Sequence, residues 1–293
     1  MSIFVCGALH LDVIVSAPRL PRLDETLVGQ DVRYALGGKG GNQAVMAARL
    51  GAKVAMAGAI GDDLFADDLL ASLANAGVDT AQVQRLSGPS GMSVAILDLD
   101  GNYGAVIVSA ANLALNPSSI NLPKDTRILL LQNEIPEAAN LAPARLARAL
   151  GAKVVFNAAP ARSLAPDLLA LTDILVVNRV EALDLTGNND PARALGDLAK
   201  LGPAQVIITL GADGLVMLED GRISHHPGHE VDALSTHGAG DGFLGALAVA
   251  LDGGATLQGA ASFAQAAAAL HVSTPPENRA AISADRVRAY SSP

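Results

Sequence analysis

The sequence has 293 residues but no tryptophan, and aromatic residues make up only 3% of it. It has one cysteine, Cys6, so neither an internal disulfide nor a cysteine cluster that binds a metal can form. No apolar run reaches the roughly 18 residues that indicate a membrane span. The first residues also lack the basic start and long apolar stretch of a signal peptide. We therefore expect a cytoplasmic protein with a core of aliphatic side chains.

Basic residues are also in deficit, with 20 lysines and arginines against 29 aspartates and glutamates and a net charge of -9. An acidic surface repels the phosphates of nucleic acids and the head groups of anionic lipids. We therefore expect neither a nucleic acid nor a membrane as a partner, and an anionic substrate would need a local positive site.

Apolar runs of strand length alternate with longer helical stretches rich in alanine and leucine. Runs without polar alternation are typical of strands buried on both faces, and the repeated strand-then-helix order favours a parallel sheet. We expect one α/β domain over residues 1–293, a three-layer sandwich around a mostly parallel sheet. Strands are expected at 2–7, 53–59, 127–131, 153–156, 174–177 and 205–210, and helices at 41–50, 64–76, 137–150 and, in two parts, 245–272.

Two segments, 11–36 and 91–109, do not follow this strand-then-helix order, because polar and apolar residues alternate in them. The second contains Asp100, Gly101 and Asn102, and an Asp-Gly pair between two such runs indicates a hairpin turn. We expect the two segments to form a small separate sheet, which would lie over an active site as a lid.

A glycine-rich segment opens directly into the expected helix at 41–50, with two glycines on each side of Lys39. Glycine lets the backbone approach a ligand, while the helix N-terminus and the lysine favour an anion. Asn42 offers a donor and an acceptor for hydroxyl groups. The segment is not a Walker A loop. An ordinary glycine-rich turn with an exposed lysine explains the same residues.

A second glycine-rich segment precedes the long apolar helical region near the C-terminus. Gly238, Ala239 and Gly240 have almost no side chains, so their amides are able to converge on an anion. Asp241 then falls in the first helical turn, where it either caps the helix or takes a proton from a hydroxyl group.

The two segments, with seven further pieces in a fixed order, resemble the PfkB carbohydrate kinases, the ribokinase-like family. The resemblance covers nearly the whole chain and implies the family fold, with its small β-sheet lid. The pieces are residues 7–12, 38–43, 61–63, 111–112, 131–134, 157–161, 178–181, 209–214 and 238–241.

The resemblance implies roles for individual residues, together with ATP and Mg²⁺ as the phosphate donor and its metal. Asp241 matches the catalytic base, and Gly238, Ala239 and Gly240 match the anion hole. The sugar-binding positions are Asp12, Gly38, Lys39, Asn42 and Glu134; the nucleotide-binding positions are Asn178, Thr209, Gly211, Gly214 and Gln265; Glu181 matches the magnesium-associated position.

The chain departs from the family pattern at three places. His10 stands where an asparagine usually contacts the sugar. Ser235 replaces an aspartate that in the family belongs to a monovalent-cation site beside the anion hole, and residues 275–278 lack the glycine-containing turn that completes this site. Loss of the carboxylate removes charge that a potassium ion would need, which argues against potassium activation.

The resemblance implies an ATP-dependent kinase that phosphorylates the primary hydroxyl of a pentose, with D-ribose first and ribose 5-phosphate as its product. A nucleoside or pseudouridine kinase on the same fold is one alternative, and a sugar- or nucleotide-binding protein without turnover is another. The family's lid sheets often pair, so we also expect a homodimer through 11–36 and 91–109.

Overall fold

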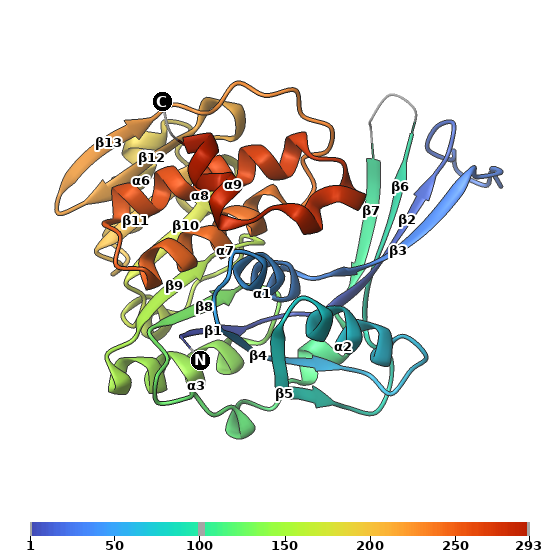
Figure 1. Cartoon of the computed structure of the whole chain (residues 1–293), viewed down its shortest axis with the longest axis horizontal. Helices are drawn as coiled ribbons and strands as arrows, with labels where there is room; N and C mark the ends of the chain where they lie inside the picture. The colour runs from blue at the N-terminus through green and yellow to red at the C-terminus, as the bar shows by residue number, and fades with distance from the viewer. Residues whose placement is uncertain (1, 99–102, 292–293) are drawn as a thin grey trace.

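A nine-stranded sheet crosses the centre of the molecule (Figure 1). The computed structural model describes residues 2–98 and 103–291. Neighbouring strands run parallel from β11 to β5, whereas β12 and β13 form an antiparallel edge. Across the sheet the order is β13 (Arg222–His226), β12 (Leu215–Glu219), β11 (Gln205–Thr209), β10 (Ile174–Asn178), β9 (Lys153–Asn157), β8 (Ile128–Gln132), β1 (Ile3–Cys6), β4 (Val54–Ile60) and β5 (Val78–Arg85).

Helices cover both faces of this sheet. Among the described residues, no helix combines the length and the hydropathy needed to cross a membrane. One face carries α1 (Lys39–Arg49), α2 (Ala66–Asn75), α7 (Ala239–Asp252), α8 (Leu257–Ser273) and α9 (Ala284–Ser291). The other carries α3 (Glu137–Leu150), α4 (Pro166–Leu169), α5 (Arg179–Thr186) and α6 (Pro191–Ala199).

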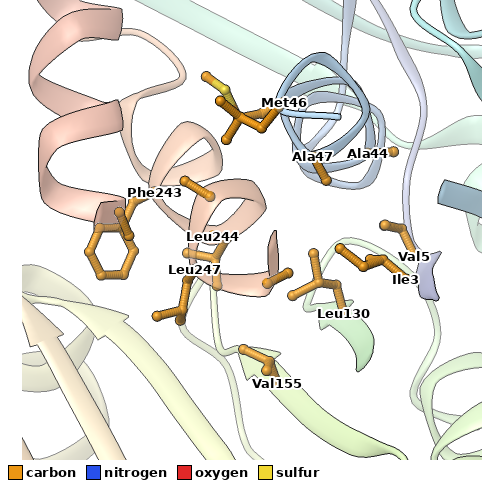
Figure 2. Packing of buried hydrophobic residues seen from close by; sticks show 14 of the residues in the cluster. Ile3, Val5, Ala44, Met46, Ala47, Leu130, Val155, Phe243, Leu244 and Leu247 are labelled. Carbon is orange, nitrogen blue, oxygen red and sulfur yellow. The ribbon is translucent and has the colours of Figure 1, made fainter. Parts of the chain in front are cut away.

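Each central strand contributes side chains to two separate cores. In β1, Ile3 and Val5 point into the cluster beneath α1 and α7, whereas Phe4 and Cys6 point into the cluster beneath α3. Successive strand residues face opposite sides of a sheet, so a strand buried on both faces is apolar throughout. Figure 2 shows the first cluster, in which side chains of β1, β8 and β9 meet those of α1 and α7.

A four-stranded sheet extends away from this body (Figure 1). Its middle strands β2 and β6 pair in parallel, and each has an antiparallel outer neighbour. Its base packs on the main core through Leu11, Leu36 and Met92. The predicted turn at 100–102 lies outside the described residues. The strands, in order, are β3 (Asp31–Gly37), β2 (His10–Ser16), β6 (Gly91–Leu97) and β7 (Tyr103–Val108).

The elements expected from the sequence are present within about six residues of their predicted bounds, but the helices α4, α5, α6 and α9 and three strands were not predicted. β5 and β13 lie at the two edges of the large sheet, and most of their residues are exposed or half-buried. They therefore carry polar side chains and lack the apolar run that marks a central strand. The apolar strand β12 was missed because its polar hairpin partner, β13, gave no strand pattern.

The end of β1 approaches the start of α1 so closely that a side chain has no room. A Cβ built at Gly7 would lie 1.8 Å from Gln132 Oε1 and 2.9 Å from the Cα of Gly40. Neither neighbour is able to yield freely, because one is a buried side chain and the other is backbone.

Gly7→Ala should therefore destabilise the protein by about 1–3 kcal/mol, the usual range for an overpacked site. Gly196→Ala is the matched control, because a Cβ there meets nothing within 4 Å and the residue lies inside α6. Alanine should raise stability there by up to about 1 kcal/mol. Urea unfolding of both variants measures the two changes. Equal stability of Gly7→Ala and the wild type would contradict the close approach.

Candidate active site

The Asp241 carboxylate is held between the first turns of two helices. It belongs to the first turn of α7, and the residue is only 8% exposed. Asn42 Nδ2 donates to Asp241 Oδ2 at 3.1 Å, and Gln43 Nε2 donates to Asp241 Oδ1 at 3.1 Å. Both donors come from α1, which begins at Lys39. Asp241 is therefore more than a helix cap, because its oxygens are oriented by side chains from another part of the chain.

A chain of buried amides continues from this carboxylate into the core. Gln132 Nε2 donates to Gln43 Oε1 at 2.8 Å, and Asn140 Nδ2 donates to the Gln132 carbonyl at 2.8 Å. All three amide side chains are fully buried. The sequence assigned no role to Gln43 or Gln132, although both lie inside pieces of the family pattern. A polar residue in the otherwise apolar strand β8 was the available signal.

The backbone at the start of α7 turns sharply at Gly238, whose φ of 75° is in the left-handed region that favours glycine. The Ala239 amide donates to the Thr236 carbonyl at 3.2 Å. Among the described residues, the amides of Gly240 and Asp241 donate to no backbone carbonyl. Gly240 was predicted to belong to the anion hole and Asp241 was not, whereas the amide of Ala239, which was predicted, is already bonded. The two free N–H groups and the helix dipole leave this helix end open to an anion.

Lys39 is the positive centre of the site. Burial opposes its charge, but the carboxylates of Asp241, Glu134 and Glu181 together raise the pKa of Lys39 above its ordinary value. The Lys39 amide also donates to Glu134 Oε2 at 2.8 Å. Burial raises the pKa of Glu134 to about 7, although Lys39 opposes this shift. The structure thus brings the predicted base, the lysine and two predicted ligand-binding carboxylates into one electrostatic cluster.

Two residues of the small sheet border this cluster. Asp12 is buried on β2, and its Oδ2 lies 3.4 Å from His237 Nε2 in the loop before α7. The hydrogen bond with Asp12 raises the pKa of His237. His10 is buried, and burial lowers its pKa. Its Nε2 finds no hydrogen-bond partner among residues 2–98 and 103–291. Sequence analysis missed the link through His237, because no local pattern joins that loop to β2.

A capping box joins Asn178 and Glu181 at the start of α5. Asn178 Oδ1 accepts from the Glu181 amide at 2.8 Å, and Glu181 Oε2 accepts from the Asn178 amide at 2.8 Å. Burial raises the pKa of Glu181. Thr209 lies beside Asn178 on the next strand, at the same edge of the sheet. In the described part of the chain, no group of three or more acidic, histidine or cysteine side chains is placed to hold a metal ion.

The remaining nucleotide-site candidates surround the turn after β11. Gly211 and Gly214 both have positive φ, and a Cβ at Gly214 would lie 2.1 Å from the His226 carbonyl. Gln265 on α8 donates to the Pro227 carbonyl at 3.2 Å. These contacts hold the turn against the segment after β13. Within the described part of the chain, Gln265 forms no hydrogen bond with the Asp241 cluster, so it belongs to a separate part of the site.

The chain is similar to known proteins over nearly its whole length. Residues 2–280 match the model of the pfkB family carbohydrate kinases. The ribokinase of Haemophilus influenzae is 36% identical over 278 residues, which cover 92% of this chain and 91% of that protein. The crystal structure of ribokinase from Thermotoga maritima superposes with a TM-score of 0.90 at 30% identity and covers 99% of both chains. The structure of Arabidopsis thaliana ribokinase complexed with ribose and ATP also has a TM-score of 0.90, at 28% identity, and covers 99% of this chain and 98% of that one. The fold class predicted from the sequence is confirmed.

Glu134→Gln should become more stable relative to the wild type as the pH rises from about 5 to about 8. Because the pKa of Glu134 is raised to about 7 in the folded protein, the folded state retains a proton that the unfolded chain loses near pH 4.5. Wild-type stability should therefore fall across this window, by on the order of 1–3 kcal/mol, whereas glutamine does not titrate.

Urea unfolding of the ligand-free protein at the two pH values measures the difference. Glu137→Gln, at an exposed glutamate in the first turn of α3, is the matched control and should not show this change with pH. A constant stability difference between Glu134→Gln and the wild type would contradict the raised pKa.

Proposed function

The chain belongs to the pfkB family of carbohydrate kinases and is a phosphotransferase with an alcohol acceptor, and from this premise we propose that it phosphorylates D-ribose with ATP. The primary hydroxyl is the acceptor and ribose 5-phosphate the product. The observation that carries this proposal is the buried Asp241 carboxylate, which two side chains of α1 orient beside free amides at the start of α7.

Asp241 is the general base of the proposed reaction. Asn42 and Gln43 hold its two oxygens in place, and each oxygen keeps a lone pair for another donor. The primary hydroxyl of the sugar gives its proton to the carboxylate as its oxygen bonds to the γ-phosphorus. The bond from this phosphorus to the bridging oxygen breaks, and ADP leaves. A positioned base of this kind contributes roughly 10²–10⁴-fold to the rate.

The charge of the transferring phosphoryl group needs fixed positive partners in the same place. We assign this role to the free amides at Gly240 and Asp241, to the dipole of α7 and to the Lys39 ammonium group. Donors that are already held in position need no reorganisation during the reaction, which is why such groups contribute strongly to catalysis.

The sugar lies between the small sheet and the main body in this proposal. Asp12 and Glu134 supply carboxylates for its hydroxyl groups, Asn42 supplies an amide, and the backbone at Gly38 allows close approach. His10 is placed to distinguish between sugars, because its buried Nε2 has no partner among the described residues. A hydroxyl group that reaches this nitrogen would satisfy it.

The nucleotide lies along the edge of the sheet beyond Asn178 and Thr209, with Gly211, Gly214 and Gln265 beside it. Glu181 is the residue that would hold Mg²⁺, through water, because its second carboxylate oxygen has no partner among the described residues. When bound, the ion neutralises charge on the nucleotide phosphates. The partly buried carboxylate fits this task, since magnesium prefers hard oxygen ligands and keeps several waters.

The exposed part of one face of the small sheet supports a homodimer. Tyr34, Val13, Val94 and Val106 are cross-strand neighbours and therefore lie on one face, opposite to that of Asp12. Val106 is 67% exposed and Tyr34 is 63% exposed. Because an apolar row on an exposed sheet face needs a cover, we infer that a second copy of this chain packs against it.

Asp241→Asn should lower turnover on D-ribose by roughly 10²–10⁴-fold while sugar and nucleotide binding stay close to wild type. ADP release measures turnover, and calorimetry measures binding. Asp220→Asn is the control, because this exposed turn residue has a φ of 48°, which asparagine tolerates.

The same assay with a panel of pentoses, hexoses and nucleosides tests the substrate. Preferred turnover of D-ribose is the expected result. A preference for a nucleoside would assign the chain to the nucleoside kinases, and binding without turnover on any acceptor would favour the binding-protein alternative.

Val106→Asp should convert the dimer into a monomer, because it places a charge in the apolar row on the edge strand β7. Sedimentation at micromolar concentration measures the mass. Ile223→Asp is the matched control, since Ile223 is an exposed β-branched residue on the edge strand β13. A wild-type chain that sediments as a monomer would overturn the dimer proposal.

A further inference from the structure

A buried guanidinium group lies directly behind the start of α7. Arg279 belongs to the short 3₁₀ segment Pro276–Ala281, and the residue is only 9% exposed. Its Nε donates to the Thr274 carbonyl at 3.2 Å, Nη2 to the Ser235 carbonyl at 3.0 Å and Nη1 to the His237 carbonyl at 3.4 Å. The group therefore joins the end of α8 to the loop that leads into the Gly238 cap.

Neutral carbonyl groups hold this charge. No carboxylate among the described residues forms an ion pair with Arg279. Burial and the neighbouring Arg49 lower the pKa of Arg279, and Glu277 opposes the shift, but a guanidinium stays charged through such shifts. Main-chain carbonyl oxygens are also the ligands that replace the water shell of a bound potassium ion. The surroundings of the Arg279 guanidinium therefore resemble those of such an ion.

The monovalent-cation site that family membership implies does not fit the residues at this corner of the molecule. Ser235 supplies a hydroxyl where a carboxylate would balance the ion, and its carbonyl already accepts from Arg279. The His237 carbonyl accepts from Arg279 and also lies 2.9 Å from His271 Nε2. A potassium ion would have to displace a covalently attached cation from the same oxygens.

We propose that Arg279 is a built-in cation that takes the place of a bound monovalent ion, so that catalysis by this chain needs no potassium. The inference rests on the proposed kinase function. Arg279 is a positioning residue, because its three hydrogen bonds go to main-chain carbonyls and it acts through them. Its guanidinium fixes the carbonyls of the 235–237 loop and thereby fixes the amides at the start of α7, where the phosphoryl charge develops. Its positive charge also adds to the potential at that helix end.

The wild-type arm of the test measures ADP release with D-ribose and ATP–Mg, with tetramethylammonium as the only monovalent cation present. Adding potassium at physiological concentration should change kcat by less than about threefold. Activation by potassium of more than about tenfold would overturn the proposal.

Arg279→Ala should lower kcat by roughly tenfold or more in the absence of potassium, with a smaller change in the KM for ribose. Potassium or free guanidinium should then restore part of the lost rate, which a purely structural defect would not allow. Arg286→Ala is the control, because this exposed arginine on α9 also donates to a main-chain carbonyl, at 3.2 Å from Ala281 O. Unchanged activity of Arg279→Ala without potassium would refute the role.

A second readout does not depend on turnover. Potassium should raise the melting temperature of Arg279→Ala above its value in an equal concentration of tetramethylammonium, because the freed carbonyls bind the ion. The wild type should show no difference between the two salts, and a potassium-specific rise in the wild type would contradict the inference. If no acceptor is phosphorylated, the proposed function fails, but these melting temperatures still decide the role of Arg279. If Arg279→Ala does not fold, Arg279→Lys retains a cation and should remain independent of potassium.

Discussion

The burial of the Asp241 carboxylate between two helices is the constraint on which the rest of the site depends. A buried carboxylate is stable only with donors on its oxygens, and α1 supplies both of them through Asn42 and Gln43. These short side chains reach Asp241 only if α1 and α7 pack closely. A Cβ at Gly245 would lie 2.7 Å from the Gln43 carbonyl, so the helix contact itself requires glycine. The proposed base is thus positioned by the packing of the core rather than by a flexible loop.

The charges around this proposed base explain why phosphate transfer there would need further cations. Asp241, Glu134 and Glu181 all act on Lys39, so three carboxylates surround one ammonium group in the ligand-free protein. A nucleotide phosphate that approached alone would meet an excess of negative charge. Magnesium with the nucleotide, the dipole of α7 and the fixed guanidinium behind it would all offset this excess. The same burial that raises the pKa of Glu134 also strengthens each of these interactions, because little water is present to screen them.

Sequence reasoning succeeded where a local pattern has a direct physical cause. The central strand β10 begins with an apolar run because both of its faces are buried. The strand β13 lies at an edge of the sheet, and its polar residues gave no strand pattern in the sequence. In the site, the ordered family pieces pointed to Asp241 and Lys39. The partners of these residues were harder to find. Gln43 and Asp241 are 198 positions apart, and Arg279 meets the Ser235 carbonyl across 44 positions. Such contacts depend on how finished elements pack, which no local spacing encodes.

The loop before α7 is held differently on its two sides, and this difference separates substrate recognition from catalysis. The His237 carbonyl faces Arg279 and His271, which keep the backbone in place. The His237 imidazole instead faces Asp12 on the small sheet, where the proposed sugar would compete for the carboxylate. A sugar that binds Asp12 therefore needs to move only an exposed side chain, while the amides at the start of α7 keep their positions. Because electrostatic stabilisation depends on groups that do not reorganise, this arrangement lets the small sheet change its contacts with the sugar without disturbing the anion site.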